Sequence, residues 1–313
     1  MELLDAIIVG GGPAGLNAAV VLGRCRRKLL VFDTGNQRNK DSHGMHNYLT
    51  RDDILPTDFL KACYGELEKY GVPLLRKKIV SARKNGDNVF VVYDEENTIY
   101  YAKKLLIATG LKDKVPDIKG FREMYGKSVH HCPYCDGWEA RDKKLGVYAR
   151  NKEGFELALS LKAWSTEVTL YTDGKNKVTE LQKEQLLANG IEVVKDSFDQ
   201  LEGKDGMLEA ILFKNGERRA CDVMFFVNGY EQQCNLVETF DCRISKKGVV
   251  VTNRFQQTST DGLYVAGDAD VDVQFVVVAA AEGAKAGVII NKELQKEISD
   301  RNSTKKRESL VQL

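Results

Sequence analysis

The sequence has no long hydrophobic run, few prolines and no excess of charge of either sign. The longest apolar run near the C-terminus, residues 275–281, is far too short to cross a bilayer. Lysine and arginine total 46 against 45 aspartate and glutamate residues, so net charge points to neither nucleic acid nor a membrane as a partner. With 43% apolar residues, 5 prolines and 27 glycines, the composition is that of a packed globular protein.

Residues 1–5 have neither the basic start nor the long apolar stretch that a signal peptide would show. We therefore expect a cytoplasmic protein, a class in which stable structural disulfides are rare. The 7 cysteines are an odd number, and only Cys132 and Cys135 form a recognisable spacing. The others are scattered and are expected to be small core residues or incidental thiols: Cys25, Cys63, Cys221, Cys234 and Cys242.

The length of 313 residues leaves room for two domains of ordinary size. Two stretches resemble each other at a constant offset, residues 5–33 and residues 144–173. Each consists of a short apolar strand, a turn, an amphipathic helix and a second strand, which is the βαβ unit of a dinucleotide-binding fold. The sequence therefore predicts an α/β protein with two Rossmann-like dinucleotide-binding domains.

Further elements follow from local patterns. Residues 88–93 and 98–101 are predicted to form paired strands, and a buried strand follows that ends at Gly110. More strands are predicted at residues 190–194, 208–213, 223–228 and 263–268, and a helix at residues 275–294. Residues 296–313 are polar and lack periodicity, so we expect a frayed or disordered tail there.

Two candidate hinges, around residues 114–119 and 245–248, enclose the second βαβ unit. This arrangement predicts that the second domain is inserted into the first. We therefore expect an outer domain of residues 1–116 and 246–313 and a central domain of residues 117–245 that carries the cysteine pair.

The first βαβ unit carries the glycine pattern Gly10-x-Gly12-x-x-Gly15 directly after a strand and at the start of a helix. Gly10 permits the tight turn, Gly12 lets a pyrophosphate approach the backbone, and Gly15 lets the helix pack on the strand. Asp33 ends the next strand at the spacing expected for an acid that binds ribose hydroxyls. This acid would repel a 2′-phosphate, so the pattern favours FAD or NAD over NADP.

The segment Cys132-Pro-Tyr-Cys135 is the second candidate site. Two cysteines at this spacing at a helix start can close a small disulfide ring, and the helix N-terminus lowers the pKa of the first thiol. Half of a zinc site, helped by His130 and His131, is the alternative, but a zinc site needs four ligands and the sequence contains no second such pair. We therefore favour redox chemistry without a metal, with both histidines as solvated or packing residues.

Asp136 directly follows the second cysteine. It is predicted to give a proton to the leaving thiolate when electrons pass between a flavin and the disulfide. The alternative is an acidic residue that interacts with the helix dipole.

Taken in order, four motifs give the chain a resemblance to low-molecular-weight thioredoxin reductases: the glycine pattern at 10–15, Ala-Thr-Gly at 108–110, Cys-Pro-Tyr-Cys-Asp at 132–136 and Gly-Asp at 267–268. The resemblance covers about residues 3–295. It implies an FAD-binding outer domain, a pyridine-nucleotide-type central domain with the redox-active disulfide, and a homodimer. A thioredoxin-like protein or another small disulfide or dithiol would be the partner.

The resemblance also assigns cofactor contacts. It places Asp33 at the adenosine ribose, and Asp268, after Gly267, at the ribityl chain. The family has an Arg-Gln pair where this chain has Val273 and Gln274, so that contact is half kept. The remaining assigned residues bind the pyrophosphate (Gly10, Gly12, Pro13, Ala14 and Gly15) or lie near the isoalloxazine ring (Asn47, Thr109 and Gly110).

The second βαβ unit departs from the family. Asn151 replaces the glycine that admits the pyrophosphate, and Thr172-Asp173-Gly174 stands where the family has a His-Arg-Arg cluster for the 2′-phosphate of NADPH. Charge-assisted hydrogen bonds contribute about 1.5–3 kcal/mol each, so losing two weakens NADPH binding roughly 10²- to 10⁴-fold. Tight NADPH binding is therefore not expected.

Several functions remain open at this point. The first is a disulfide reductase with another electron donor, either NADH bound by Asp173 or a reduced protein such as ferredoxin. The second is a dithiol oxidase that uses oxygen as acceptor. The third is a non-catalytic flavin redox sensor, which an intact Cys132, Cys135 and Asp136 disfavour. Ordinary NADPH-dependent reduction by an atypical site is the fourth.

Overall fold

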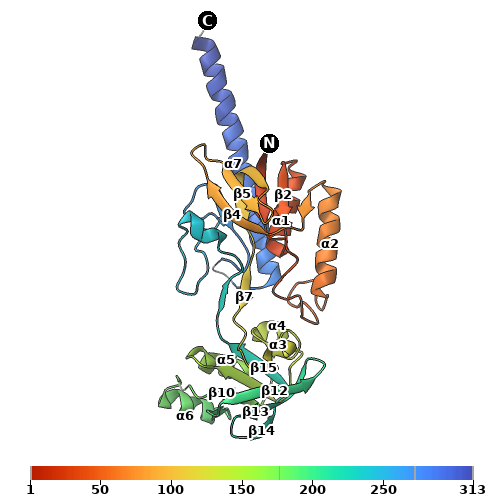
Figure 1. Ribbon diagram of the computed structural model, residues 1–313, viewed down its shortest axis with the longest axis vertical. Coiled ribbons are helices and arrows are strands. Elements are labelled where there is room, and N and C mark those ends of the chain that lie inside the picture. The colour runs from red at the N-terminus through yellow and green to blue at the C-terminus, as the bar shows by residue number, and fades with distance from the viewer. Residues whose placement is uncertain (1, 176, 271–272, 312–313) are drawn as a thin grey trace. The chain divides into compact units, whose positions relative to one another are not determined.

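The computed structural model describes residues 2–175, 177–270 and 273–311. The chain divides into two compact units, whose elements are drawn in Figure 1. Unit 1 consists of Met1–Arg38, Thr57–Lys112 and Glu231–Leu313, and unit 2 consists of Asn39–Pro56 and Asp113–Tyr230. Unit 2 thus interrupts unit 1, and the predicted α/β fold with two Rossmann-like units is confirmed.

Unit 1 is built on a seven-stranded sheet in the order β3-β2-β1-β6-β5-β4, with β17 paired to β6. The strands β1, β2, β3, β6 and β17 are parallel, whereas β4, β5 and the first half of β6 form an antiparallel meander. Their bounds are β1 Leu3–Val9, β2 Leu29–Phe32, β3 Leu74–Leu75, β4 Ile79–Lys84, β5 Phe90–Asp94, β6 Ile99–Ile107 and β17 Leu263–Val265.

The predicted pair of strands around residue 94 is confirmed by β5 and β6. The buried strand predicted to follow is the second half of β6 itself, since β6 runs without a break to Ile107. Its first half pairs with β5 and its second half with β17, so one strand serves both the meander and the parallel sheet. The carboxyl ends of β1, β6 and β17 therefore lie side by side, where a dinucleotide binds in this architecture.

Three long helices and a short 3₁₀ helix belong to the segments of unit 1: α1 Pro13–Arg24, α2 Pro56–Lys69, α7 Val276–Val311 and η1 Leu236–Phe240. The helix α7 packs on α1 through two glycines, because a Cβ atom at Gly283 would meet the carbonyl oxygen of Ala14 at 1.9 Å and one at Gly287 would meet Val21 at 3.0 Å. This contact holds the start of α7 beside the start of α1.

The tail predicted for residues 296–313 is wrong for the described residues, since α7 continues to Val311 (Figure 1). The segment contains neither glycine nor proline and is rich in lysine, glutamate and arginine, which have good helix propensity. Propagation from an already packed helix avoids the unfavourable nucleation step. Over residues 296–304, most of which are exposed, the absence of an apolar period therefore marked a solvent-facing helix and not disorder.

Unit 2 contains the second βαβ unit in a five-stranded parallel sheet, in the order β11-β10-β9-β15-β8. These strands are β8 Val129–His130, β9 Leu145–Ala149, β10 Val168–Tyr171, β11 Glu192–Val194 and β15 Val223–Val227. A separate antiparallel sheet consists of β12 Phe198–Lys204, β13 Met207–Phe213 and β14 Arg218–Ala220. The helices are α3 Phe121–Met124, α4 Pro133–Asp136, α5 Glu153–Leu161 and α6 Glu180–Ala188.

The compact units begin and end at residues other than the predicted domain limits near 116 and 246. Residues 231–245 group with unit 1, because Leu236, Val237 and Phe240 are buried in the core formed by β1, β5, β6 and β17. Residues 39–56 group with unit 2. The chain passes between the units through β7 Leu111–Asp113 and β16 Tyr230–Gln232, which pair with each other.

The contact between α1 and α7 predicts that Gly283→Ala destabilises the protein by about 1–3 kcal/mol, because the new methyl group would overlap the backbone of α1. Gly65→Ala on α2 is the matched control, since no atom lies within 4 Å of a Cβ placed there. The control is expected to stabilise by about 0.5–1 kcal/mol through helix propensity. Thermal unfolding of both variants measures the difference, and equal midpoints would contradict this packing.

Candidate functional site

The glycine pattern of unit 1 is imposed by close backbone contacts at two of its three positions. Gly10 has φ +115°, and a Cβ there would lie 2.2 Å from the carbonyl oxygen of Ala108. A Cβ at Gly15 would lie 1.9 Å from the carbonyl oxygen of Gly10. Gly12 is different, because no atom lies within 4 Å of the Cβ position. Gly10 and Gly15 therefore serve packing, and Gly12 faces open space.

The backbone N–H groups at the start of α1 have no side-chain acceptor of the kind that usually caps a helix. Its N-cap is Gly12, which has no side chain to accept a hydrogen bond, and Pro13 follows at the first helical position. The first turn contains no acidic residue. Unsatisfied N–H groups and the positive end of the helix dipole thus meet the open space at Gly12, and this combination fits a diphosphate.

Asp33, the predicted ribose ligand, lies at the end of β2 and is mostly buried. Its carboxylate accepts hydrogen bonds from the Tyr64 hydroxyl at 3.3 Å and the Gly35 N–H at 3.1 Å, and it forms an ion pair with Arg76. The side chain also covers Gly11, where a Cβ would meet the Asp33 Cγ at 2.5 Å. Asp33 is therefore held firmly beside the glycine turn, as its predicted role requires.

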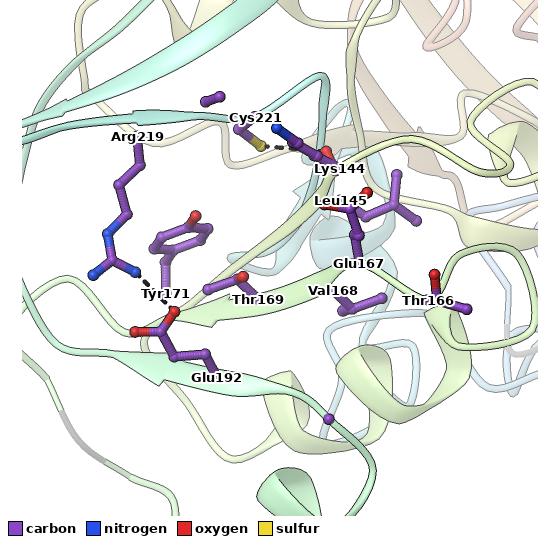
Figure 2. Close-up of a pocket in the computed structure, with 12 residues that line it drawn as sticks. Lys144, Leu145, Thr166, Glu167, Val168, Thr169, Tyr171, Glu192, Arg219 and Cys221 are labelled. Carbon is purple, nitrogen blue, oxygen red and sulfur yellow. Dashed lines mark hydrogen bonds and ion pairs between the residues drawn. The ribbon is translucent and has the colours of Figure 1, made fainter.

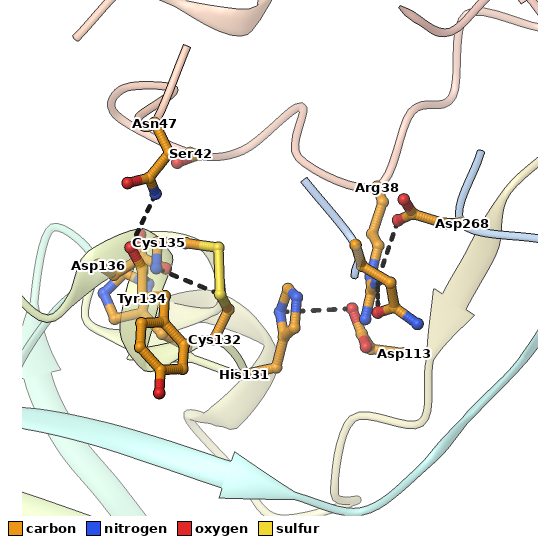
Figure 3. The surroundings of a disulfide bond; sticks show 12 residues. Arg38, Ser42, Asn47, Asp113, His131, Cys132, Tyr134, Cys135, Asp136 and Asp268 are labelled. Atoms are coloured by element: carbon orange, nitrogen blue, oxygen red, sulfur yellow. Dashed lines mark hydrogen bonds and ion pairs between the residues drawn. A yellow bond between two sulfur atoms is a disulfide. The ribbon is translucent and has the colours of Figure 1, made fainter. Parts of the chain in front are cut away.

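The other predicted flavin residues of unit 1 gather at the same sheet edge. A Cβ at Gly267 would lie 3.0 Å from the Cβ of Ala14, so Asp268 directly follows a residue in contact with the glycine turn. The Gly267 N–H donates to the buried carboxylate of Glu282 at 2.7 Å. Arg38, which the sequence did not single out, contacts both Asp268 and Gln274 (Figure 3).

Thr109 and Gly110 follow β6 at this edge. The Cys234 thiol donates a hydrogen bond to the Thr109 Oγ1 atom at 3.4 Å, and the Gln233 N–H donates one to the Gly110 carbonyl at 3.1 Å. Unit 1 therefore brings together an open helix end, a ribose acid, and polar residues at the ends of β6 and β17. These residues fit FAD, which would place its diphosphate at Gly12 and its flavin toward Asp268 and Gln274.

In unit 2, Cys132 and Cys135 form a disulfide bond with their Cα atoms 5.3 Å apart (Figure 3). Cys132 is the N-cap of the short helix α4, and its Sγ accepts a hydrogen bond from the Cys135 N–H at 3.2 Å. Gly137 ends α4 against the Trp164 ring, which a Cβ there would meet at 2.7 Å. The predicted disulfide pair is thus fixed in place by the local backbone and by an aromatic wall.

Two histidine–aspartate pairs flank this disulfide. The Nδ1 atom of His130 lies 3.2 Å from the Asp136 carboxylate, and that of His131 lies 3.6 Å from the Asp113 carboxylate. Asp113 also accepts a hydrogen bond from the Tyr125 hydroxyl at 2.5 Å. The sequence-based interpretation of both histidines as solvated or packing residues missed these pairs. Two adjacent histidines directly before a reactive cysteine were the available signal.

Asn47 was predicted to lie beside the flavin, and the structure brings it to the disulfide helix. Its Nδ2 atom donates to the Tyr134 carbonyl at 2.8 Å (Figure 3). The preceding His46 lies 3.6 Å from Asp52 and 3.7 Å from Glu139, the latter just beyond α4. Residues 39–56 therefore dock on the segment that carries the cysteines, while Tyr134 itself is 66% exposed. A contact between Asn47 and the flavin stays a prediction.

At the start of α5, in the second βαβ unit, a side chain bonds one backbone N–H group. The Asn151 side-chain oxygen accepts a hydrogen bond from the Glu153 N–H at 3.2 Å, and the Asn151 Nδ2 atom donates to the Glu153 carboxylate at 3.2 Å. Glu153 and Glu156 both lie in the first turn of α5. The Glu153 N–H is thus already bonded to a side chain, and two acidic residues lie in a first turn whose counterpart in α1 has none. Only the packing role of the glycine pattern survives, at Gly154, whose Cβ would meet Ala149 at 2.4 Å.

Asp173, at the end of β10, is also turned inward. Its carboxylate accepts hydrogen bonds from the Tyr148 hydroxyl and the Phe198 N–H, each at 3.0 Å, and lies 3.5 Å from the Arg150 Nε. Burial and the negative charge of Asp173 raise the pKa of Tyr148, so the hydroxyl stays protonated as a donor. Asp173 is therefore engaged in the core of unit 2, where it braces β9 and β12.

A pocket of about 360 Å³ lies at the opposite end of the same sheet (Figure 2). It is lined by the amino ends of β9, β10 and β11, whereas nucleotides bind at carboxyl ends in such folds. Its Arg219 is held by Glu192 and Glu217, at 2.9 and 2.6 Å. Burial raises the pKa of the Cys221 thiol to about 12, which makes it a poor nucleophile at neutral pH. These features assign no chemistry to the pocket.

Among residues 2–175, 177–270 and 273–311, no three His, Cys, Asp or Glu side chains are grouped so that they could hold a metal ion. None of the helices in those ranges combines the length and the apolar character needed to span a bilayer.

Comparison with known proteins matches residues 4–283 to the family model described as Pyridine nucleotide-disulphide oxidoreductase. Among curated proteins, the thioredoxin reductase tcpT of Claviceps purpurea is 30% identical over 316 residues, which cover 96% of this chain and 98% of tcpT. Among solved structures, the TrxB protein of Bacillus anthracis is 32% identical with a TM-score of 0.89, covering 94% of this chain and 99% of TrxB. HlmI is 30% identical with a TM-score of 0.94, covering 98% of this chain and 97% of HlmI.

Proposed function

Because the chain belongs to the pyridine nucleotide-disulphide oxidoreductase family and resembles thioredoxin reductases, we propose that it is an FAD-dependent disulfide oxidoreductase that works without NAD(P)H. Two electrons would pass between the flavin and the Cys132–Cys135 pair. A dithiol substrate would deliver them, and oxygen would take them, so the net reaction is oxidation of a dithiol to a disulfide with formation of hydrogen peroxide.

The observation that carries this proposal is the contrast between the two helix ends. The first turn of α1 has no acidic residue, whereas that of α5 carries Glu153 and Glu156 and the Asn151 side chain accepts the Glu153 N–H. A diphosphate at α5 would have to compete with the Asn151 side chain for the Glu153 N–H and would meet two nearby negative charges. The chain therefore supports one bound dinucleotide, FAD, and not a second one.

NADH as an alternative donor is also disfavoured. The obstacle to NADH is the same as for NADPH, a diphosphate at the start of α5, because Asp173 is engaged no more than Asp33 is and does not by itself exclude a ribose. With both nucleotides disfavoured as electron donors, thiols remain as reductants, because they can exchange directly with the Cys132–Cys135 disulfide. We therefore favour the dithiol oxidase over the NADH-fed reductase.

The thiol chemistry can be written with its protons. A substrate thiolate attacks one sulfur of the Cys132–Cys135 disulfide and forms a mixed disulfide, which the second substrate thiolate resolves. The products are the substrate disulfide and a Cys132/Cys135 dithiol, because each of the two leaving thiolates takes one of the two protons that the substrate thiols gave up. When bound, FAD supplies the acceptor for the electron pair and its route to oxygen.

Asp136 is the proton-transfer residue in this proposal, and His130 positions it. Asp136 directly follows Cys135, and the His130 Nδ1 atom lies 3.2 Å from its carboxylate. A histidine–carboxylate pair can hold one proton between two groups, so it can take a proton from a thiol or return one to a thiolate. The pair therefore serves electron flow in either direction.

Reduction of a thioredoxin-like protein is the second candidate, and the name of tcpT as a thioredoxin reductase favours it. A reduced protein such as ferredoxin would then replace NADPH as donor. Tyr134 and Trp138, both 66% exposed beside the cysteines, offer a surface on which a protein disulfide could dock. Cytoplasmic location and a homodimer remain predictions.

The proposal predicts the outcome of mixing the oxidised yellow protein with candidate donors without oxygen. A small dithiol should bleach the flavin absorption band, whereas NADPH or NADH at roughly 100 times the protein concentration should not. In air, the dithiol should yield about one peroxide per disulfide formed, by the balance above. Cys135→Ser is the control and should abolish both effects. Full bleaching by NADPH would contradict the proposal. If the dithiol bleaches the flavin without oxygen but forms no peroxide in air, the reductase is favoured.

The proton-transfer role predicts that Asp136→Asn slows dithiol-dependent flavin reduction at least about 10²-fold, because an amide cannot exchange the proton. His130→Gln keeps a hydrogen bond to Asp136 but cannot hold a proton, so we expect a smaller loss and an altered pH–rate profile. Exposed His43→Gln is the matched control. Stopped-flow absorbance measures all three variants. A pH profile of His130→Gln that overlays that of His43→Gln would rule out the positioning role.

A further inference from the structure

Arg38 connects two residues of unit 1 that the cofactor assignment places at the flavin. Its Nη1 atom donates to the Asp268 carboxylate at 3.0 Å and to the Gln274 side-chain oxygen at 2.6 Å (Figure 3). The two hydrogens of one terminal nitrogen are thus shared between two acceptors. The Arg38 side chain is only 12% exposed and that of Asp268 23%, so this is a largely buried contact and not a surface ion pair.

The position of this contact follows from packing that is independent of any ligand. Asp268 follows Gly267, whose Cβ position is 3.0 Å from the Cβ of Ala14 in the glycine turn. Gln274 lies just before α7, and the Gly283 contact holds that helix against the backbone of Ala14. The Arg38 guanidinium therefore sits at the end of the site that begins at the open N-terminus of α1.

Val273 stands where the resemblance places an arginine, and its side chain is apolar and 54% exposed. The cation expected next to Gln274 is therefore missing from α7's own segment. We propose that Arg38, on the loop after β2, supplies this cation from a different part of the chain and positions Asp268 and Gln274 for the flavin. The two segments are 236 residues apart in sequence, which is why no local motif reveals the exchange.

The physical consequence concerns the charge of the flavin. Two-electron reduction adds negative charge to the ring system, and the protein tunes its potential through charges held nearby. With Arg38 in place, the negative charge of Asp268 is balanced. Without Arg38, an uncompensated carboxylate would face the cofactor in a largely buried site, and reduced flavin would be disfavoured more than oxidised flavin.

The test measures FAD binding and flavin potential in Arg38→Met, with Arg83→Met on the exposed face of β4 as the matched loss of an arginine in the same unit. Both changes are made in the full chain with Cys132→Ser and Cys135→Ser, so that only the flavin takes up electrons. Arg38→Met should raise the dissociation constant of FAD about tenfold or more. A further tenfold preference for oxidised over reduced FAD corresponds to a potential about 30 mV lower.

Arg38→Lys keeps a cation but not the planar fork, so it should bind FAD severalfold more weakly while it keeps most of the potential. This variant decides the question if Arg38→Met does not fold. A dissociation constant and a potential that match those of Arg83→Met, in whichever Arg38 variant folds, would overturn the proposal. The inference rests on the FAD site alone, and the serine background cannot perform the proposed thiol chemistry, so its failure is distinct from a failure of the dithiol oxidase.

Discussion

The peptide N–H groups at the start of a helix need partners, and this chain satisfies them differently in its two βαβ units. At α1 the glycine turn leaves them free, beside open space and with no acidic residue in the first turn. At α5 the side chain of Asn151 accepts one of them and two glutamates occupy the first turn. The same strand–helix–strand arrangement therefore fits a diphosphate in unit 1, whereas in unit 2 a side chain of the protein already bonds one of the N–H groups. The proposed function depends on this difference between the starts of α1 and α5.

The disulfide site illustrates how a reactive group is held by ordinary packing. Gly137 allows α4 to lie against Trp164, and Asn47 ties residues 39–56 to the same helix. Histidine–aspartate pairs on both sides give the cysteines local groups that can hold protons. The Asn151 contact and the acidic first turn of α5 lie in the same unit as the disulfide, and together they are the basis for proposing electron exchange with thiols.

Much of the fold could be read from the sequence, because strands buried on both faces and glycine turns leave strong local signals. Both βαβ units, the strand pair of β5 and β6 and the disulfide pair were predicted from residues close together in the chain. What the sequence missed depends on long-range contacts. The grouping of residues 39–56 with unit 2, the His130–Asp136 pair and the Arg38 contacts join segments or side chains whose meeting no periodicity encodes. The length of α7 was missed for another reason, since polarity was taken for disorder although helix propensity was high.

The most direct test of the central claim is the number of dinucleotides that one chain binds. Calorimetric titration of the FAD-loaded, oxidised protein with NADP⁺ and with NAD⁺ measures binding at the second site without any turnover. The account predicts no saturable heat for either nucleotide up to about millimolar concentration, where even weak specific sites fill. Binding of one nucleotide per chain with a micromolar dissociation constant would contradict this claim. The Asn151 contact and the acidic first turn of α5 would then not exclude a diphosphate.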